Sequence, residues 1–576
     1  MAQKQKLELT WIGKEERPRL EPRILLEDPE KSYHAKEKVT ENDIFDNRLI
    51  FGDNLLALKA LEQEFSGQIK CIYIDPPFNT GSAFEHYDDS VEHSLWLGLM
   101  RDRLEILRRL LTPDGFLCCH IDDSEGAYLK VLLDEVFLRS NYLTTFYVQV
   151  RYPEKTLKQD MAFHKEIEQV HIYRRGYGAQ PNQNQVDSSF EKFCFYVHEK
   201  HPGRNIQLGG KNVTVFLPGQ YEVVTGEGSQ DGLKEIWATG TILDGNSSGR
   251  FFRDYLTGRT EVDGLGVLYK VSGIGDDKFD HRYFTGPKRA GATKGKYYQG
   301  VPMEQLANPE LQKFSPIENF YDLAGNFGNC RHEGGVDFRG GKKPERLLEI
   351  VLQHFSNPGE WVLDSFGGSG TTGAVAHKMG RRWIMIELNP HCETHIVPRL
   401  VSVINGDDSG GVTESNAWAG GGGFRFFRLA PSLLEKDRFG LPVISKKYNA
   451  AMLTEAMCKL LGFQYSPNEE IYWQHGRATE KDYLYVTTQT LSHEQLAQLS
   501  GEVGDNRTLL VCCCAFRGKP AMFNNLTVQK IPGSVLDRCE WGKDDYSLQV
   551  ENLPQARKPQ PPPQMGLFGT DQGNPE

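Results

Sequence analysis

Four consecutive residues in the first quarter of the chain have the types needed to hold an amino group: Asp75-Pro76-Pro77-Phe78. They follow an apolar run at 69–74, which predicts a buried strand. The two prolines fix φ and lack N–H donors, so the chain leaves the sheet as a stiff loop with free carbonyls, an acceptor-only carboxylate and an aromatic ring. Such a loop can bind a flat, amino-bearing ligand. A purely structural Pro-Pro turn would use the same residues, so the motif needs support from elsewhere in the chain.

A glycine-rich turn far downstream supplies that support. Phe366-Gly367-Gly368-Ser369-Gly370 lies between an expected strand at 361–364 and an expected helix at 371–379, and a second strand at 383–387 ends in Glu387. This order is typical of a nucleotide-binding βαβ unit, in which glycines let the backbone approach a ligand and the carboxylate accepts both ribose hydroxyls.

A nicotinamide-dependent oxidoreductase is the competing interpretation. Gly368, Gly370 and Gly373 match the G-x-G-x-x-G spacing of dinucleotide-binding proteins. Against it, Asp364 and Phe366 precede the glycines, two threonines follow them, and no hydride-transfer constellation is visible. It would also leave the Asp-Pro-Pro-Phe loop unexplained.

The elements around both motifs predict an α/β fold with a mainly parallel sheet covered by helices on both faces. Ligands of such sheets bind at the carboxyl ends of the strands, where Asp53 and Asp75 both lie. Expected strands are at 47–51, 69–74, 116–121, 143–150, 168–173, 361–364 and 383–387, and expected helices at 55–61, 92–111, 128–138, 346–355 and 371–379.

Composition sets the outer limits. A chain of 576 residues with 39% hydrophobic residues predicts three to four globular domains. The absence of a long apolar run and of a signal-like N-terminus favours the cytoplasm and no membrane contact. Eleven cysteines without metal-ligand spacing predict reduced thiols and no metal site. The net charge of −11 excludes a uniformly basic protein, although local clusters can still bind nucleic acid.

Such a cluster lies in the Gly-, Asn- and Ser-rich region at 176–335. Residues 281–302 contain five cations among four aromatic rings and no acidic residue. Cations beside exposed rings suit a phosphate backbone with bases nearby, and a solvated loop is the alternative. The residues expected to contact nucleic acid are Arg282, Lys288, Arg289, Lys294, Lys296 and Tyr297.

Together the two motifs resemble the DNA amino-methyltransferases, which methylate the exocyclic nitrogen of adenine or cytosine. The catalytic motif precedes the cofactor motif, and an insert lies between them. This is the order of the circularly permuted β group, which includes the modification subunits of type III restriction systems. Residues 45–175 and 336–392 carry the resemblance, with Phe51-Gly52-Asp53-Asn54 and Lys343-Pro344-Glu345 among the matching segments. One departure is Ser365, where the family commonly has proline.

The resemblance implies an S-adenosylmethionine cofactor and no metal. The glycine turn would approach its methionine portion, Glu387 its ribose, and Asp53 would contact it from the neighbouring strand end. Lys343-Pro344-Glu345 would close the methionine end. The residues expected to bind the cofactor are Asp53, Lys343, Asp364, Phe366, Gly368, Ser369, Gly370, Thr371 and Glu387.

The resemblance also assigns the chemistry to Asp75, Pro76, Pro77 and Phe78. Asp75 and the Pro76 carbonyl would accept the two N–H bonds of the target amine and localise its lone pair for attack on the sulfonium methyl group. The base must be flipped from the duplex, and Phe78 would stack on it. The aspartate favours adenine N6, because cytosine-N4 members more often have serine there; cytosine N4 and a catalytically silent DNA-binding module are the alternatives.

The domain prediction follows from these segments. It comprises an N-terminal arm at 1–48 lying over the surface of a domain, catalytic and cofactor parts at 49–175 and 336–405, a target recognition insert at 176–335, a smaller α/β domain at 406–553 and a disordered tail at 554–576.

The expected partners are double-stranded DNA, a second copy of the chain and a restriction or helicase subunit. Gln564-Met565-Gly566-Leu567-Phe568 in the tail resembles the peptide that binds the bacterial sliding clamp. An incidental Leu-Phe pair is the alternative.

Overall fold

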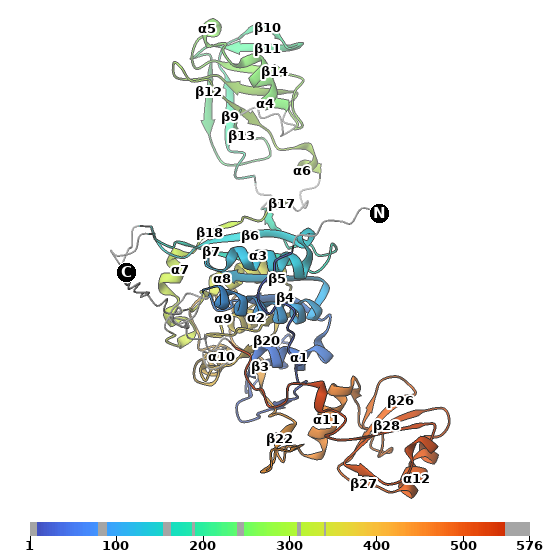
Figure 1. Ribbon diagram of the computed structural model, residues 1–576. Helices are drawn as coiled ribbons and strands as arrows, with labels where there is room; N and C mark the ends of the chain where they lie inside the picture. Colours follow the sequence, from blue (N-terminus) through green and yellow to red (C-terminus); the bar gives the residue numbers. More distant parts are fainter. Residues whose placement is uncertain are drawn as a thin grey trace, which may run out of the picture. The chain divides into compact units, whose positions relative to one another are not determined.

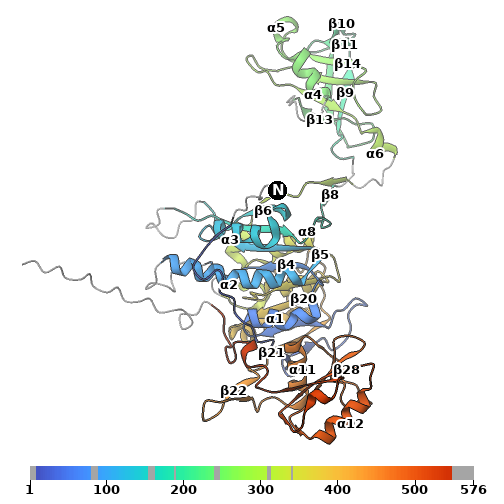
Figure 2. The same ribbon diagram turned by 45° about the vertical axis from the view of Figure 1, so that its right-hand side comes forward.

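The computed structural model describes residues 8–78, 89–153, 163–186, 190–238, 247–307, 313–338 and 341–547. The predicted tail, its clamp-like peptide Gln564–Phe568 and the three residues Asn79–Gly81 after the Asp-Pro-Pro-Phe motif lie outside this part. The chain forms two compact units (Figures 1 and 2). The first comprises Met1–Asn182 and Glu318–Glu576, and the second comprises Gln183–Ile317.

The first unit is built on one large mixed sheet. Its centre is parallel, with the strand that carries the glycine motif placed between the strand of Glu387 and the strand of Asp75. The five central strands, in spatial order, are β3 (Asn47–Phe51), β20 (Arg382–Glu387), β19 (Trp361–Asp364), β4 (Ile69–Ile74) and β5 (Leu111–Ile121). Beyond β5, β7 (Ile167–Arg174) pairs antiparallel with β5, and β6 (Tyr142–Gln149) pairs antiparallel with β7. The strand β18 (Phe320–Asp322) follows β6. Beyond β3 lie β21 (Gly423–Leu429), β1 (Leu25–Glu27) and β2 (Tyr33–His34).

Alternating side chains of these strands pack against two helix layers. On β20, Ile384 and Ile386 join a core cluster with the helices α1 (Asn54–Phe65), α2 (Asp89–Leu110) and α3 (Gly126–Leu133). Trp383 and Met385 point the other way, toward α9 (Thr371–Lys378), which packs with α8 (Glu345–Phe355) and α10 (Val397–Asn405). The predicted covering of both sheet faces by helices is therefore confirmed.

Element boundaries differ from the prediction mainly at β5 and α3. Residues 112–115, which lie before the strand expected at 116–121, form the start of β5, because Leu111 pairs with Ile69 and the register then shifts before Cys71. Such an irregularity accommodates Pro113 in a strand. The helix expected at 128–138 is α3 followed by a π-helical turn, Asp134–Leu138.

The predicted arm at the N-terminus lies on the first unit. β1 pairs with β21, Trp11 is buried, and Arg101 of α2 donates to the backbone oxygen of Glu16 at 2.9 Å. The arm therefore covers α2 and one edge of the sheet.

The predicted smaller α/β arrangement is present after β21. The parallel strands β26 (Asp482–Val486), β28 (Thr508–Cys513) and β30 (Leu526–Lys530) pack with α11 (Ala450–Leu461) and α12 (His493–Val503). Cys512 and Cys513 are buried in this core, as expected, while Cys514 is exposed.

The second unit is a six-stranded antiparallel sheet with one core cluster on each face. Its strands, in spatial order, are β10 (Arg204–Leu208), β11 (Lys211–Phe216), β14 (Leu268–Ser272), β15 (His281–Thr285), β16 (Lys296–Gln299) and β13 (Lys234–Trp237). The pair β9 (Phe195–Glu199) and β12 (Tyr221–Thr225) contributes to the core on one face, and α4 (Ser247–Phe251) to that on the other. The unit lies within residues 176–335, the range predicted for the insert.

Within the ranges that the structure describes, no helix is both long enough and apolar enough to span a membrane.

Gly370 and Gly359 allow steric crowding to be separated from backbone strain. Both have positive φ, 78° and 82°, but a Cβ on Gly370 would lie 2.8 Å from Cγ2 of Ile396, whereas a Cβ on Gly359 would meet nothing within 4 Å. Gly359→Ala should lower the free energy of unfolding by about 1 kcal/mol from the φ strain alone, and Gly370→Ala by about 2–4 kcal/mol. Urea unfolding measures both, and equal losses would contradict the packing described here.

Candidate active site

A pocket of about 440 Å³ opens at the carboxyl ends of the central strands. Because β19 lies between β20 and β4, this pocket is lined at once by Glu387, by Phe366 and Gly368 of the glycine turn, and by the loop Asp75-Pro76-Pro77-Phe78. The two motifs that are about 290 residues apart in the sequence thus line a single cavity.

Glu387 is buried at the end of β20 and is held by backbone groups. Its Oε2 accepts from the N–H of Gly368 at 2.8 Å, and its Oε1 accepts from the N–H of Asn389 at 2.9 Å. Burial alone would raise the pKa of Glu387, but His391 and these N–H groups outweigh it and lower the pKa below its usual value. Nδ2 of Asn389 also donates to Oε1 at 3.2 Å, so of about four acceptor positions on the carboxylate one, on Oε2, remains for a hydroxyl donor.

Asp364 organises the glycine turn from beneath. Its Oδ1 accepts from the N–H of Phe366 at 2.9 Å, and its Oδ2 accepts from Oγ1 of Thr372 at 2.5 Å. Burial beside Asp75 and Glu387 raises the pKa of Asp364 to about 7 despite these bonds. The Asp364 side chain therefore acts on the turn rather than on the pocket surface.

The third glycine of the spacing brings helix and sheet together. A Cβ on Gly373 would lie 2.3 Å from Cε of Met385, so any larger residue there would displace the end of the Met385 side chain from the contact between α9 and β20.

Completely buried ion pairs hold the other side of the turn. Arg399 donates to the backbone oxygen of Ser369 at 3.1 Å and to Oγ1 of Thr371 at 2.8 Å, and it pairs with Glu345 at 2.7 Å. Glu345 also pairs with Lys378 at 2.7 Å. Glu345 of the Lys-Pro-Glu segment, together with Ser369 and Thr371, therefore supports the turn from within the protein.

Lys343 lies at the catalytic motif. Its Nζ is 3.2 Å from Oδ1 of Asp75, 3.3 Å from Oε2 of Glu168 and 4.5 Å from the centroid of the Phe78 ring. Burial raises the pKa of Asp75, and Lys343 and His120 only partly oppose this rise. The sequence interpretation placed Lys343 at the methionine end of a cofactor, whereas these contacts place its ammonium beside the Asp75 carboxylate.

A short chain of polar contacts continues behind this lysine. Glu168 lies 2.8 Å from Nε2 of His120, and Nδ1 of His120 lies 2.8 Å from the hydroxyl of Tyr73. On the other side of the motif, Nε1 of Trp96 donates to the Pro77 oxygen at 2.8 Å. The loop is therefore fixed from both sides.

At the end of β3, the predicted Asp53 and its neighbour Asn54 have different surroundings. Asp53 is the N-cap of α1, as expected for a residue at this position, and its Oδ2 accepts from the N–H of Tyr546 at 2.9 Å. Asn54 lines the pocket, donates to the backbone oxygen of Ser365 at 2.7 Å and accepts from Nε of Arg103 at 2.5 Å. Arg103 is buried and also lines the pocket.

Sequence reasoning missed Arg103, His120 and Glu168. Arg103 occupies a position of the apolar stripe of α2, between Leu99 and Leu107, and His120 is the one polar residue in the run 116–121. A charged or polar residue in an apolar pattern was the available signal.

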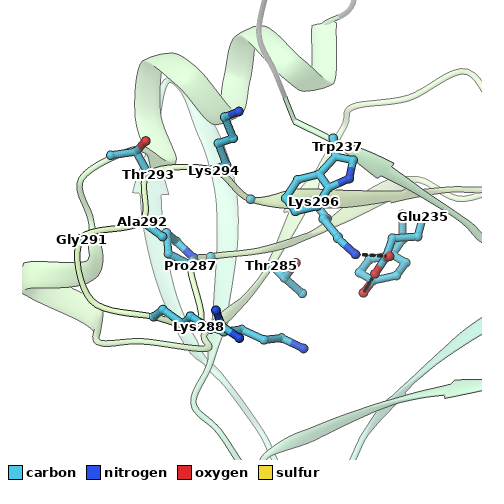
Figure 3. A pocket seen from close by; sticks show the side chains of 14 residues that line it. Glu235, Trp237, Thr285, Pro287, Lys288, Gly291, Ala292, Thr293, Lys294 and Lys296 are labelled. Carbon is cyan, nitrogen blue, oxygen red and sulfur yellow. Dashed lines mark hydrogen bonds and ion pairs between the residues drawn. The ribbon is translucent and has the colours of Figure 1, made fainter. Parts of the chain in front are cut away.

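In the second unit, the loop between β15 and β16 surrounds a pocket of about 540 Å³ (Figure 3). Lys288, Arg289 and Lys294 are exposed on this loop. Lys296 pairs with Glu235, and its Nζ lies 4.8 Å from the Trp237 ring centroid, beside which Figure 3 shows it. Trp237 is 58% exposed.

The aromatic rings expected to be exposed there are instead buried. Phe284 and Tyr297 pack in the core cluster on one face of the sheet, and Tyr283 and Tyr298 pack in the cluster on the other. The reason is that β15 and β16 are interior strands with both faces covered. Arg282 is also buried, with Asp277 at 2.6 Å and Asp276 at 3.2 Å. Of the residues predicted to bind nucleic acid, only the three loop cations are fully exposed.

A family model described as DNA methylase matches residues 69–397, more than half of the chain and both motifs. The chain belongs to this DNA methylase family.

Curated relatives agree with this assignment. The chain is 32% identical to the probable HindVI Mod subunit of a type III restriction-modification enzyme from Haemophilus influenzae, over 67% of this chain and 54% of the relative. It is 29% identical to the type II methyltransferase M.KpnI from Klebsiella pneumoniae, over 65% of this chain and 88% of the relative. The chain thus spans about half the length of the first relative. A solved structure of the PvuII DNA methyltransferase, described as cytosine-N4-specific, aligns with 13% identity and a TM-score of 0.32, over 67% of this chain and 94% of that one.

The pKa of Asp364 predicts a pH-dependent stability difference. Its value of about 7 lies above the value near 4 expected in an unfolded chain, so the ionised form destabilises the folded state increasingly as the pH rises through this range. The free energy of unfolding of Asp364→Asn minus that of the wild type should therefore rise by about 2–3 kcal/mol between pH 5 and pH 8. Urea unfolding at both pH values measures it, and a difference that does not change with pH would contradict the assignment.

Proposed function

We propose that the protein transfers a methyl group from S-adenosylmethionine to the exocyclic N6 of a flipped adenine in double-stranded DNA, as part of a restriction-modification system. The observation that carries the proposal is the strand order β20-β19-β4, because it puts Glu387 and Asp75 in one pocket on either side of the glycine turn. Membership in the DNA methylase family supports the reaction class.

The pocket fits this cofactor in size and in chemistry. Its volume of about 440 Å³ lies in the range of small-molecule sites. Glu387 has one free acceptor position on Oε2 and gains a second on Oε1 when the Asn389 amide turns away, which together accept two ribose hydroxyls. Phe366 offers a ring, and Gly368 has no side chain to block the backbone. Ser365 is buried in the pocket wall, and its Oγ has no hydrogen-bond partner within the described residues. S-adenosylmethionine would supply an electrophilic methyl group on its sulfonium.

The chemistry needed from the protein is orientation. The lone pair of an exocyclic amine is delocalised into the base, and acceptors at Asp75 Oδ1 and the Pro76 carbonyl would turn it toward the methyl group. A nitrogen–carbon bond forms as the carbon–sulfur bond breaks, and the nitrogen gives up one proton. The ring of Phe78 lines the pocket, where a flipped base can stack.

Adenine is proposed over cytosine because the motif begins with aspartate. The family includes both N6 and N4 enzymes, so cytosine N4 is the second candidate target. The order of the motifs, catalytic before cofactor, also supports a circularly permuted member of the fold.

The second unit would read the DNA sequence, with Lys288, Arg289 and Lys294 contacting phosphates. The assembly is proposed by analogy with the relatives, whose names describe modification subunits. The expected assembly is a homodimer of this chain that binds a restriction or helicase subunit. Its expected location is the cytoplasm. A catalytically silent DNA-binding module is disfavoured, because both the Asp75 loop and the Glu387 pocket are intact.

Replacing Asp75 tests the reaction directly. With labelled S-adenosylmethionine and whole-genome-amplified DNA, which contains no methylated bases, Asp75→Asn should reduce transfer at least about 100-fold, because an amide carries no negative charge and its NH2 group is a donor. Asp123→Asn, at the exposed end of β5, is the matched control and should transfer normally. No transfer by the wild type, or equal transfer by Asp75→Asn, would refute the function.

The role of the second unit is tested by Lys288→Ala combined with Arg289→Ala. The slope of log Kd against log salt concentration should fall by about 2, because two phosphate contacts are lost. S-adenosylmethionine affinity should not change. Lys200→Ala, which removes a lysine paired with Glu222 in the same unit, is the control. Loss of cofactor binding in the double variant would mean that the loop has another role.

A further inference from the structure

The Lys343 ammonium lies where the proposed function puts the amino group of the target base. Its Nζ is a donor 3.2 Å from Oδ1 of Asp75, and it lies 4.5 Å from the centroid of the Phe78 ring. Stacking of a base on this face of Phe78, with its amine at Asp75, requires the same space. The ammonium and the base therefore exclude each other.

A second carboxylate lies on the other side of the ammonium. Oε2 of Glu168 is 3.3 Å from Nζ of Lys343 and is itself held by His120 at 2.8 Å. Burial would raise the pKa of Glu168, but His120 and Lys343 outweigh it and lower the pKa to about 2. Glu168 is thus ionised throughout the working pH range.

A buried ammonium that loses its partner is strongly destabilising, and so is a buried carboxylate left alone. Lys343 is 7% exposed and has a long flexible stem, and its Nζ already contacts both carboxylates, so a small rotation moves it from Asp75 onto Glu168 alone. The ammonium then keeps a carboxylate partner in both states, while Asp75 exchanges the ammonium for the N–H groups of the base.

We propose that Lys343 is a resident substitute for the target amine, which contacts both Asp75 and Glu168 in the empty site and keeps only Glu168 as the base arrives. The inference rests on the proposed function, since the arriving group is the exocyclic amine of a base. No bond is made or broken in this exchange. Glu168 is a positioning residue, because it acts through the lysine.

The first test is Glu168→Gln, which keeps the size of the side chain and removes the charge that receives Lys343. Its kcat/KM for whole-genome-amplified DNA should fall about tenfold, because the lysine then stays at Asp75, while the Kd for S-adenosylmethionine stays unchanged. A normal kcat/KM would overturn the proposal.

The decisive comparison adds Lys343→Met to Glu168→Gln. Without the competing Lys343 ammonium, the double variant should have a higher kcat/KM than Glu168→Gln. Its kcat/KM should lie within about threefold of that of Lys343→Met alone. Such a non-additive result would not follow from loss of structure. Lys342→Met is the control for a buried lysine, because Lys342 donates to backbone oxygens of Arg331, Glu333 and Val336; it should not rescue. If the methionine variant fails to fold, Lys343→Gln in the same background gives the comparison.

Two further results would also overturn the proposal while leaving the proposed function in place. One is a double variant no better than Glu168→Gln. The other is a weaker Kd for S-adenosylmethionine in Lys343→Met, which would assign the lysine to the cofactor. Failure of the function itself would appear differently, as no methyl transfer by the wild type.

Discussion

Three carboxylates at the ends of adjacent parallel strands are the constraint on which the site depends. Asp75, Asp364 and Glu387 are brought together by the order β4-β19-β20, and like charges in a buried edge repel one another. Each is compensated differently: Asp75 by a lysine, Glu387 by backbone N–H groups and His391, and Asp364 by a raised pKa. The result is two carboxylates with distinct surroundings on either side of a turn that can approach a ligand.

The elements around this edge hold it rigid from several directions. Gly373 brings α9 onto β20, and the buried Glu345–Arg399 pair fixes the turn from the opposite side. The chain also returns from the C-terminal α/β part to the same edge: the N–H of Tyr546 binds Asp53, and Arg103 donates to the Tyr546 oxygen at 3.2 Å. The cofactor side of the pocket therefore depends on residues from both ends of the chain.

Much of this arrangement could be predicted from the sequence because local patterns determine it. Strand 361–364 and the helices on both faces follow from the hydrophobic periodicity, and both are present. The contact of Lys343 with Glu168, and that of Glu168 with His120, could not be predicted, because these residues come from different elements and no local signal marks a contact across a sheet. The rings at 283–298 were expected to be exposed for a related reason: whether a strand is covered on both faces depends on what packs there.

The central claim is that one pocket joins a ribose site at Glu387 to an amine site at Asp75. A crystal structure with S-adenosylhomocysteine, the product that lacks the methyl group, tests it most directly. The account predicts both ribose hydroxyls within hydrogen-bonding distance of Glu387 and the thioether sulfur directed toward Asp75. A ribose bound away from Glu387, or a sulfur facing away from Asp75, would contradict it.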